Sequence, residues 1–116
     1  MTVCASYLRD DDNGYEAVVF ERADSGSTLA VMTGLGEPTE DDIASGTAGH
    51  CVVVDDAATF YDGVERVGRD TYALAVEFSA EACAVLGTPA TVDIPLPEPT
   101  LTQIYDHLRR ITARRG

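Results

Sequence analysis

The chain has 116 residues, 45% of them apolar, and carries 20 acidic residues against eight basic ones. Its length predicts one compact domain, 1–116, that buries roughly two thirds of its unfolded surface. Residues 1–108 contain all the acids, and four of the eight arginines follow them. Such acidity repels phosphate, so binding to nucleic acid or to an anionic membrane is not expected. It attracts basic proteins, although solubility alone also explains it.

The apolar runs and the cysteines indicate where the protein is located and whether its thiols are reduced. No apolar run approaches the ~20 residues that span a bilayer, and the first residues lack the basic and apolar parts of a secretory signal. The three cysteines, Cys4, Cys51 and Cys83, form no CxxC pair. An odd number of unpaired cysteines indicates reduced, mostly buried thiols in a cytoplasmic protein.

Three antiparallel strands are predicted at the start of the chain, because apolar and β-branched runs alternate with turn residues. Asn13-Gly14 favours a tight type I′ hairpin, since both residues tolerate positive φ. A second turn is predicted at 24–27. The strands are expected at Val3–Arg9, Tyr15–Arg22 and Thr28–Thr33.

Residues 34–49 are the least regular stretch and contain four glycines and four acids. Thr39 followed by acids suits the N-terminus of a single helical turn through Ile43. The remainder is predicted as a loop. A long acidic loop between strands suits a binding surface, and a solvated connection is the alternative.

The middle of the chain predicts further strands of the same meander. Residues 51–54 ("CVVV") are apolar on both faces, as in a central strand. Residues 59–67 are expected to form one strand, in which Gly63 marks a bulge or a close backbone approach. Residues 71–78 alternate apolar with smaller or polar side chains, which indicates a half-buried strand.

The last third adds two helices and an edge strand. Ser79 is expected to cap a short helix, Ala80–Leu86, that ends at Gly87. Prolines confine the strand around Val92–Leu96 to an edge. Thr100 and Gln103 predict a capping box for a final amphipathic helix. The fold class is therefore α+β: a mostly antiparallel β-meander sheet with one short helix and a C-terminal amphipathic helix.

Chemistry is sought first at His50 and Cys51. Successive side chains of a strand point to opposite faces, so these two are not expected to pair as base and nucleophile. A buried structural Cys51 and a polar His50 at a strand end are predicted instead. Two histidines and three scattered cysteines do not supply a zinc site, and "DDDNG" at 10–14 lacks the closing acid of a calcium loop. We expect no catalytic residue, metal or cofactor.

The central sequence resembles a known family. "CVVVDDAATFYDGVERV", then "DTYALAVEFSAEACAVLG", then a strand and a terminal helix are similar to the tenth family of immunity proteins, from bacterial polymorphic toxin systems. The match is carried by Cys51–Asp55, Tyr61, Gly63–Glu65 and Ser79–Gly87, over roughly residues 50–96. Asp62 stands where the family pattern has a first glycine, and the tryptophan often found after that motif is absent.

What this resemblance implies is a cytoplasmic protein that binds and neutralises a cognate toxin, with no catalysis of its own. An acidic inhibitor fits the basic groove of a toxin that attacks nucleic acids, so we expect a basic, nuclease-type toxin as partner. Tyrosines are frequent anchors of such interfaces. The expected partner-binding residues are Glu37, Glu40, Asp41, Asp42, Asp55, Asp56, Tyr61 and Asp62, with Asp10–Asp12, Tyr7 and Tyr15 as further candidates.

Two alternatives stay open on the sequence. One is a small-molecule-binding or catalytic α+β domain with a site near His50 and Asp62, for which a deep, partly apolar pocket with a perturbed titratable group is expected. The other is a homodimer or larger homo-oligomer that binds no ligand.

Overall fold

The computed structural model describes residues 3–115, which form eight strands and three helices. The strands are antiparallel throughout, in two sheets that follow chain order. The α+β meander expected from the sequence is confirmed. The elements are β1 Val3–Asp10, β2 Tyr15–Arg22, β3 Thr28–Gly34, α1 Glu40–Ser45, β4 Cys51–Val54, β5 Ala58–Tyr61, β6 Val64–Arg69, β7 Ala73–Phe78, α2 Ala80–Leu86, β8 Thr91–Pro95 and α3 Thr100–Thr112.

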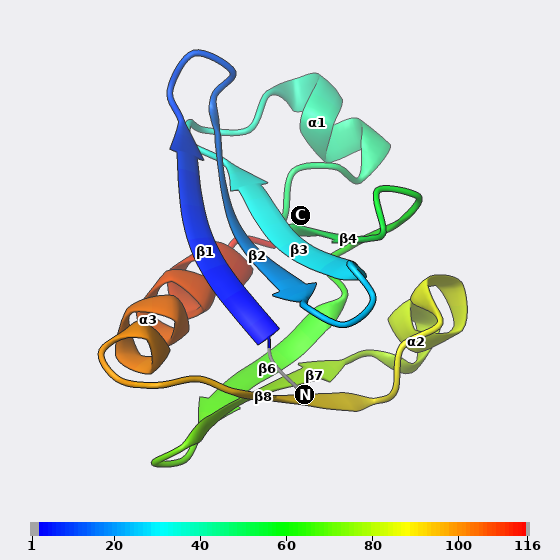
Figure 1. The fold of residues 1–116 in the computed structure, drawn as a ribbon. Coiled ribbons are helices and arrows are strands. Elements are labelled where there is room, and N and C mark those ends of the chain that lie inside the picture. Colours follow the sequence, from blue (N-terminus) through cyan, green and yellow to red (C-terminus); the bar gives the residue numbers. More distant parts are fainter. Residues whose placement is uncertain (1–2, 116) are drawn as a thin grey trace.

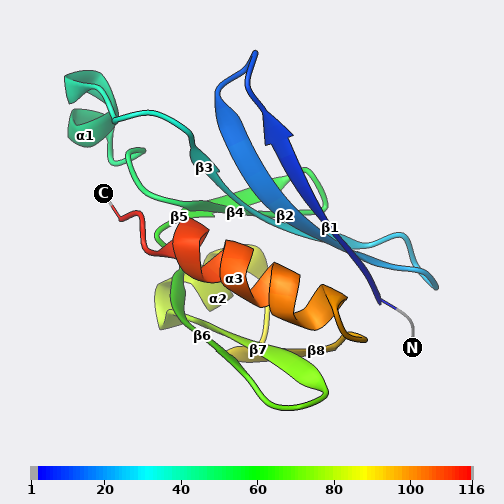
Figure 2. The same cartoon turned by 90° about the vertical axis from the view of Figure 1, so that its left-hand side faces the viewer.

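The two sheets enclose the C-terminal helix. Strands β1 to β5 form a five-stranded sheet in sequential order, and β6 to β8 form a three-stranded sheet. Figure 2 shows α3 between the two, with the larger sheet above it and the smaller one below. Four aliphatic side chains of α3 are buried there, at i, i+3, i+7 and i+10 spacing, as its amphipathic pattern predicts. They are Leu101, Ile104, Leu108 and Ile111.

The prediction of a single strand over residues 59–67 is wrong, because two strands, β5 and β6, occupy this stretch. The chain breaks at Asp62, whose φ is 56°, so that β5 ends the large sheet and β6 starts the small one. Gly63 permits a close approach here: a Cβ on it would lie 3.0 Å from Ala82 Cβ and 3.1 Å from Phe60 Cδ1. The close approach that the sequence predicted at Gly63 is therefore confirmed, although it redirects the strand and separates the sheets.

The first hairpin is confirmed in place but not in type. Strand β1 ends at Asp10 and β2 begins at Tyr15, so four residues connect them. Gly14 has a φ of 74° and donates its N–H to the Asp10 carbonyl, at 2.8 Å. The Asp10 carboxylate accepts hydrogen bonds from the Asn13 backbone and side chain, so the polar residues of this stretch build the turn itself.

Both short helices begin as the sequence predicts. Thr39 caps α1, which extends two residues beyond the expected turn. Ser79 caps α2 through the Ala82 N–H, and Gly87 ends it with a φ of 71°.

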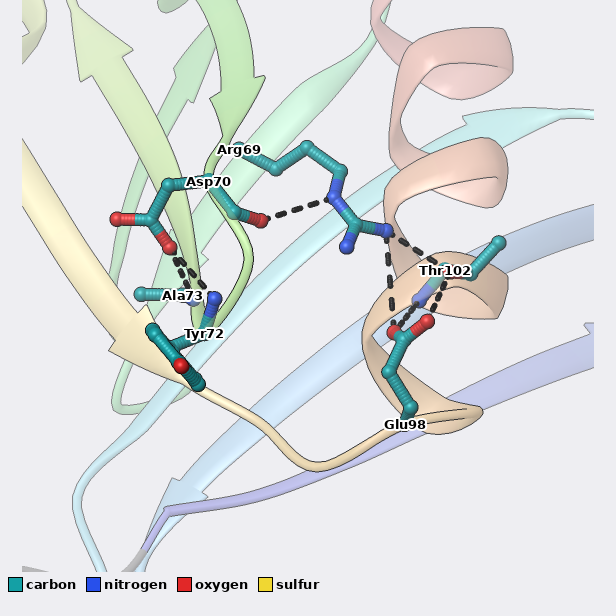
Figure 3. A network of polar contacts seen from close by, with 6 residues as sticks. All are labelled: Arg69, Asp70, Tyr72, Ala73, Glu98 and Thr102. Carbon is teal, nitrogen blue, oxygen red and sulfur yellow. Dashed lines mark hydrogen bonds and ion pairs between the residues drawn. The ribbon is translucent and has the colours of Figure 1, made fainter.

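The prediction that Thr100 and Gln103 form a capping box for α3 is wrong. The helix follows Pro99, which provides no side-chain cap. Glu98 acts instead: its carboxylate accepts the backbone N–H of Thr102 at 3.0 Å and the Thr102 hydroxyl at 2.7 Å. Figure 3 shows the same hydroxyl accepting a hydrogen bond from Arg69, at 2.8 Å. Asp70 accepts two backbone N–H groups of the β6–β7 turn, so this network fastens that turn to the start of α3.

The interior is apolar and draws on both sheets, α2 and α3. Cys51 is buried and Cys83 is partly buried, whereas Cys4 is exposed, which corrects the expectation of mostly buried thiols. Cys4 lies on the outer face of β1, where alternation directs every second side chain to solvent. No helix among the described residues has the length and apolar character to cross a membrane.

Candidate interaction surface

Helix α1 stands apart from the interior. None of its residues is buried, and Figure 2 shows it projecting beyond both sheets. Its start is well formed: the Thr39 hydroxyl accepts the Asp42 N–H at 3.1 Å, and the Asp42 carboxylate accepts the Thr39 N–H at 3.0 Å. A reciprocal box of this kind satisfies two helix donors that otherwise lack partners. The sequence thus specifies a helix that contributes no side chain to the core.

Most acidic side chains in α1 and just before it have no hydrogen-bond or ion-pair partner within residues 3–115. The carboxylates of Glu37, Glu40 and Asp41 are exposed and make no hydrogen bond or ion pair there, whereas Asp42 is used in the capping box. Ile43 is 61% exposed beside them. An exposed isoleucine among unpaired acids resembles the apolar centre of a protein interface. Sequence reasoning treated Ile43 only as the end of a helical turn.

Tyr61 lies next to α1 in space. It is 40% exposed at the end of β5, and burial, the neighbouring Cys51 thiol and the Asp42 carboxylate together raise its pKa. A shallow hollow of about 490 Å³ opens beside its ring. The acids lining this hollow are Asp62, Glu65 and Glu81, of which only Asp62 is expected from the sequence. We call α1 with Glu37, together with Tyr61 and this hollow, the acidic end.

Asp55 and Asp56 are not part of the acidic end. They form the β4–β5 turn with φ values of 53° and 56°, at the end of β5 away from Tyr61. Asp55 accepts hydrogen bonds from the Ser27 hydroxyl at 2.9 Å and the Thr28 N–H at 2.8 Å. These bonds lower its pKa and join two turns of the large sheet. Asp55 therefore has a structural role that its sequence context did not reveal.

His50 is completely buried and uses both ring nitrogens on the backbone. Nε2 accepts the Val64 N–H at 3.1 Å, so the proton lies on Nδ1, which donates to the Arg114 carbonyl at 3.0 Å. Asp62 approaches Nδ1 at 3.7 Å, yet burial dominates and lowers the pKa of His50. A neutral histidine with both nitrogens engaged has no free position for acid–base chemistry. It fixes the break between the sheets.

A second polar cluster lies where α3 crosses β1 and β2. Glu16 is 7% exposed, pairs with Arg110 and accepts the Tyr7 hydroxyl at 2.9 Å. Burial raises its pKa, but the bonds from Arg110 and Tyr7 outweigh burial and lower it overall. The Tyr7 ring stacks on His107 with centroids 3.7 Å apart. Tyr7, a candidate anchor from sequence, is thus committed to holding α3 on the large sheet.

The described residues bear on the metal and small-molecule alternatives in two ways. Within residues 3–115, no group of three or more His, Cys, Asp or Glu side chains is placed to hold a metal ion. A groove of about 680 Å³ runs along β8, and its lining does not include His50, Asp62 or Cys51. This groove therefore does not reach the residues named for the catalytic or small-molecule alternative.

Comparison with known proteins supplies the family. The profile described as immunity protein 10 matches residues 2–102, which includes both sheets and the start of α3. Comparisons with curated proteins and with solved structures find no match. The resemblance seen over residues 50–96 is confirmed and extends through the N-terminal strands. Asp62 has a φ of 56°, a backbone conformation that glycine adopts without strain. The chain belongs to the immunity protein 10 family.

Proposed function

We propose that this protein neutralises a cognate toxin of a polymorphic toxin system by binding it with the acidic end. Family membership indicates toxin neutralisation by a non-enzymatic inhibitor. Helix α1 gives the main structural support for this proposal. It is a capped helix that buries none of its residues, with unpaired acids around an exposed Ile43. A helix with no role in the core is free to serve a partner.

The partner is a basic protein surface, such as the substrate groove of a nuclease. The chain carries a formal net charge of −12, so it attracts basic proteins at long range and repels nucleic acid. At contact, Ile43 and Tyr61 supply apolar area and the surrounding acids meet the toxin's cations. The protein acts in the cytoplasm as one domain, without catalysis of its own.

Co-expression tests this function. The toxin domain encoded beside this chain is expressed in bacteria with and without it, and growth and complex formation are scored. Wild-type protein restores growth and co-purifies with the toxin. Ile43→Ala weakens toxin binding about tenfold, which corresponds to roughly 1.4 kcal/mol. Val85→Ala is the matched control, because Val85 is also exposed but lies on α2, outside the acidic end.

Two results would contradict the proposal. Absence of any complex between wild-type protein and the toxin removes the function. Equal toxin binding by Ile43→Ala and Val85→Ala leaves the function but removes α1 from the interface.

A further inference from the structure

A groove lies at the opposite end of the large sheet from α1. It has a volume of about 680 Å³ and opens to solvent. One wall is formed by residues of β1 to β4 in the large sheet, and the other by β8 with the loop after α2. Its floor is apolar, with Phe20, Leu29, Val54 and Leu86 among its lining residues.

Four consecutive residues of β8, 92–95, line this groove. Neighbouring side chains in a strand point to opposite faces, so a groove bordered by all four runs along the strand's edge. Strand β8 is one edge of the three-stranded sheet, and within residues 3–115 only β7 pairs with it. Figure 1 shows β8 in gold along the lower front of the molecule.

The hydrogen-bond register shows which backbone groups of this edge are free. Phe78 donates to the Ala90 carbonyl at 2.8 Å, and Leu96 donates to the Tyr72 carbonyl at 3.2 Å. Backbone hydrogen bonding alternates along an antiparallel pair, so the N–H and C=O groups of residues 90, 92, 94 and 96 point toward β7. The N–H and C=O groups of Thr91 and Asp93 point away from the sheet, as does the Pro95 carbonyl. They have no backbone partner within the described chain.

We propose that an extended polypeptide segment of a partner, alternating apolar and basic residues, adds to β8 as a fourth strand of the small sheet. Its backbone pairs with Thr91 and Asp93, and its inward side chains enter the apolar groove. Its outward side chains stand beside Asp93, an exposed carboxylate with no ion pair among the described residues. Asp55 lines the groove as a second acid, and Arg22, which also lines it, is paired with Asp24.

Charge distinguishes this occupant from a second copy of the chain. Antiparallel pairing of two β8 strands brings the Asp93 side chains of two acidic molecules together, which destabilises the pair. A basic segment meets the same residues with opposite charge. This site is separate from the acidic end, so it does not depend on the proposed toxin interface.

Peptide binding to isotope-labelled protein tests the proposal by NMR. The probe is a capped hexapeptide that alternates valine with lysine, and its matched control carries glutamate in place of lysine. We expect the lysine peptide to shift the backbone amides of Thr91 and Asp93 and to slow their exchange with solvent. We expect the glutamate peptide, and a lysine peptide N-methylated on its pairing edge, to bind at least tenfold more weakly.

Asp93→Pro is the informative variant, because it removes an outward N–H without removing a β7–β8 hydrogen bond. It should keep the folded spectrum and lose at least tenfold in affinity for the lysine peptide, whereas Asp106→Asn, a neutralised acid on α3, should not. Shifts confined to the acidic end, or no binding at millimolar peptide, would overturn the proposal. So would concentration-dependent shifts of Thr91 and Asp93 without peptide, which indicate self-association, or a small apolar dye that binds the groove when no peptide does.

Discussion

His50 shows how a single side chain determines the course of the backbone. Its ring accepts a hydrogen bond from the Val64 N–H and donates one to the Arg114 carbonyl. Its backbone N–H donates to the same carbonyl, and its backbone carbonyl accepts the Asp62 N–H, at 2.8 Å each. The start of β4, the break between the sheets and the end of α3 therefore meet on one residue. A buried ring with these partners is stable only while it is neutral.

This arrangement predicts a pH dependence of stability. Burial lowers the pKa of His50 in the folded protein, so the unfolded chain binds this proton more tightly. The stability that His50 contributes is complete above its unfolded pKa of about 6.5 and is lost as the pH falls through the folded pKa. We expect the free energy of unfolding in urea to fall as the pH drops below about 6.5. The slope should be smaller in His50→Gln, and an unchanged slope would contradict this role.

Gly63 shows the same precision in packing. Added at Gly63, just before β6, a Cβ meets Ala82 and Phe60 within about 3 Å, whereas at Gly68, inside β6, it meets nothing within 4 Å. Gly63→Ala should therefore destabilise the fold by about 1–3 kcal/mol, and Gly68→Ala should be neutral or slightly stabilising. Urea unfolding of the two variants checks this. Equal stability would mean that the β5–β6 junction adjusts without cost.

Among the elements, α3 has the greatest effect on the fold because both sheets pack on it. Each of its fully buried aliphatic side chains contributes about 1.5–3 kcal/mol by transfer from water. Its N-terminus is held by Glu98, whose bonds to the Thr102 hydroxyl and backbone lower the pKa of that carboxyl. The Arg69 side chain connects the same hydroxyl to the β6–β7 turn.

The cap of α3 gives a direct comparison of two residues. Glu98→Ala leaves the Thr102 N–H without its side-chain acceptor, so we expect Tm to fall by a few degrees. Gln103→Ala should leave Tm unchanged, because Gln103 takes no part in the cap and alanine favours helix. Thermal unfolding followed by circular dichroism distinguishes them. A larger loss for Gln103→Ala would restore the capping box that the sequence suggested.

Local sequence patterns predicted most helices and strands, and the elements predicted wrongly depend on tertiary contacts. Alternation located β7, and capping residues bounded α2 to the residue. The sequence did not predict the break at Asp62, because it depends on Ala82 packing against Gly63 and on His50, which lie elsewhere in the chain. Of the candidate site residues, those near α1 share one end, whereas Asp55 and Asp56 lie at the other because the β4–β5 hairpin carries them there.

For the whole molecule, shape and charge combine. Two sheets around one helix leave α1 free at one end and an open groove at the other. The formal charge of −12 surrounds both with a negative potential, which accelerates the approach of basic proteins and is screened by salt. In the proposed complex, α1 is where the approaching toxin makes contact.

The sharpest test is the rate at which the chain associates with the proposed cognate toxin. Glu37→Lys/Glu40→Lys reverses two unpaired acids of the acidic end, and Glu21→Lys/Asp106→Lys makes the same charge change elsewhere. We predict that the first double variant associates at least about tenfold more slowly than the second at low salt, with the gap narrowing as salt rises. Equal association rates for the two double variants would contradict a toxin contact at α1.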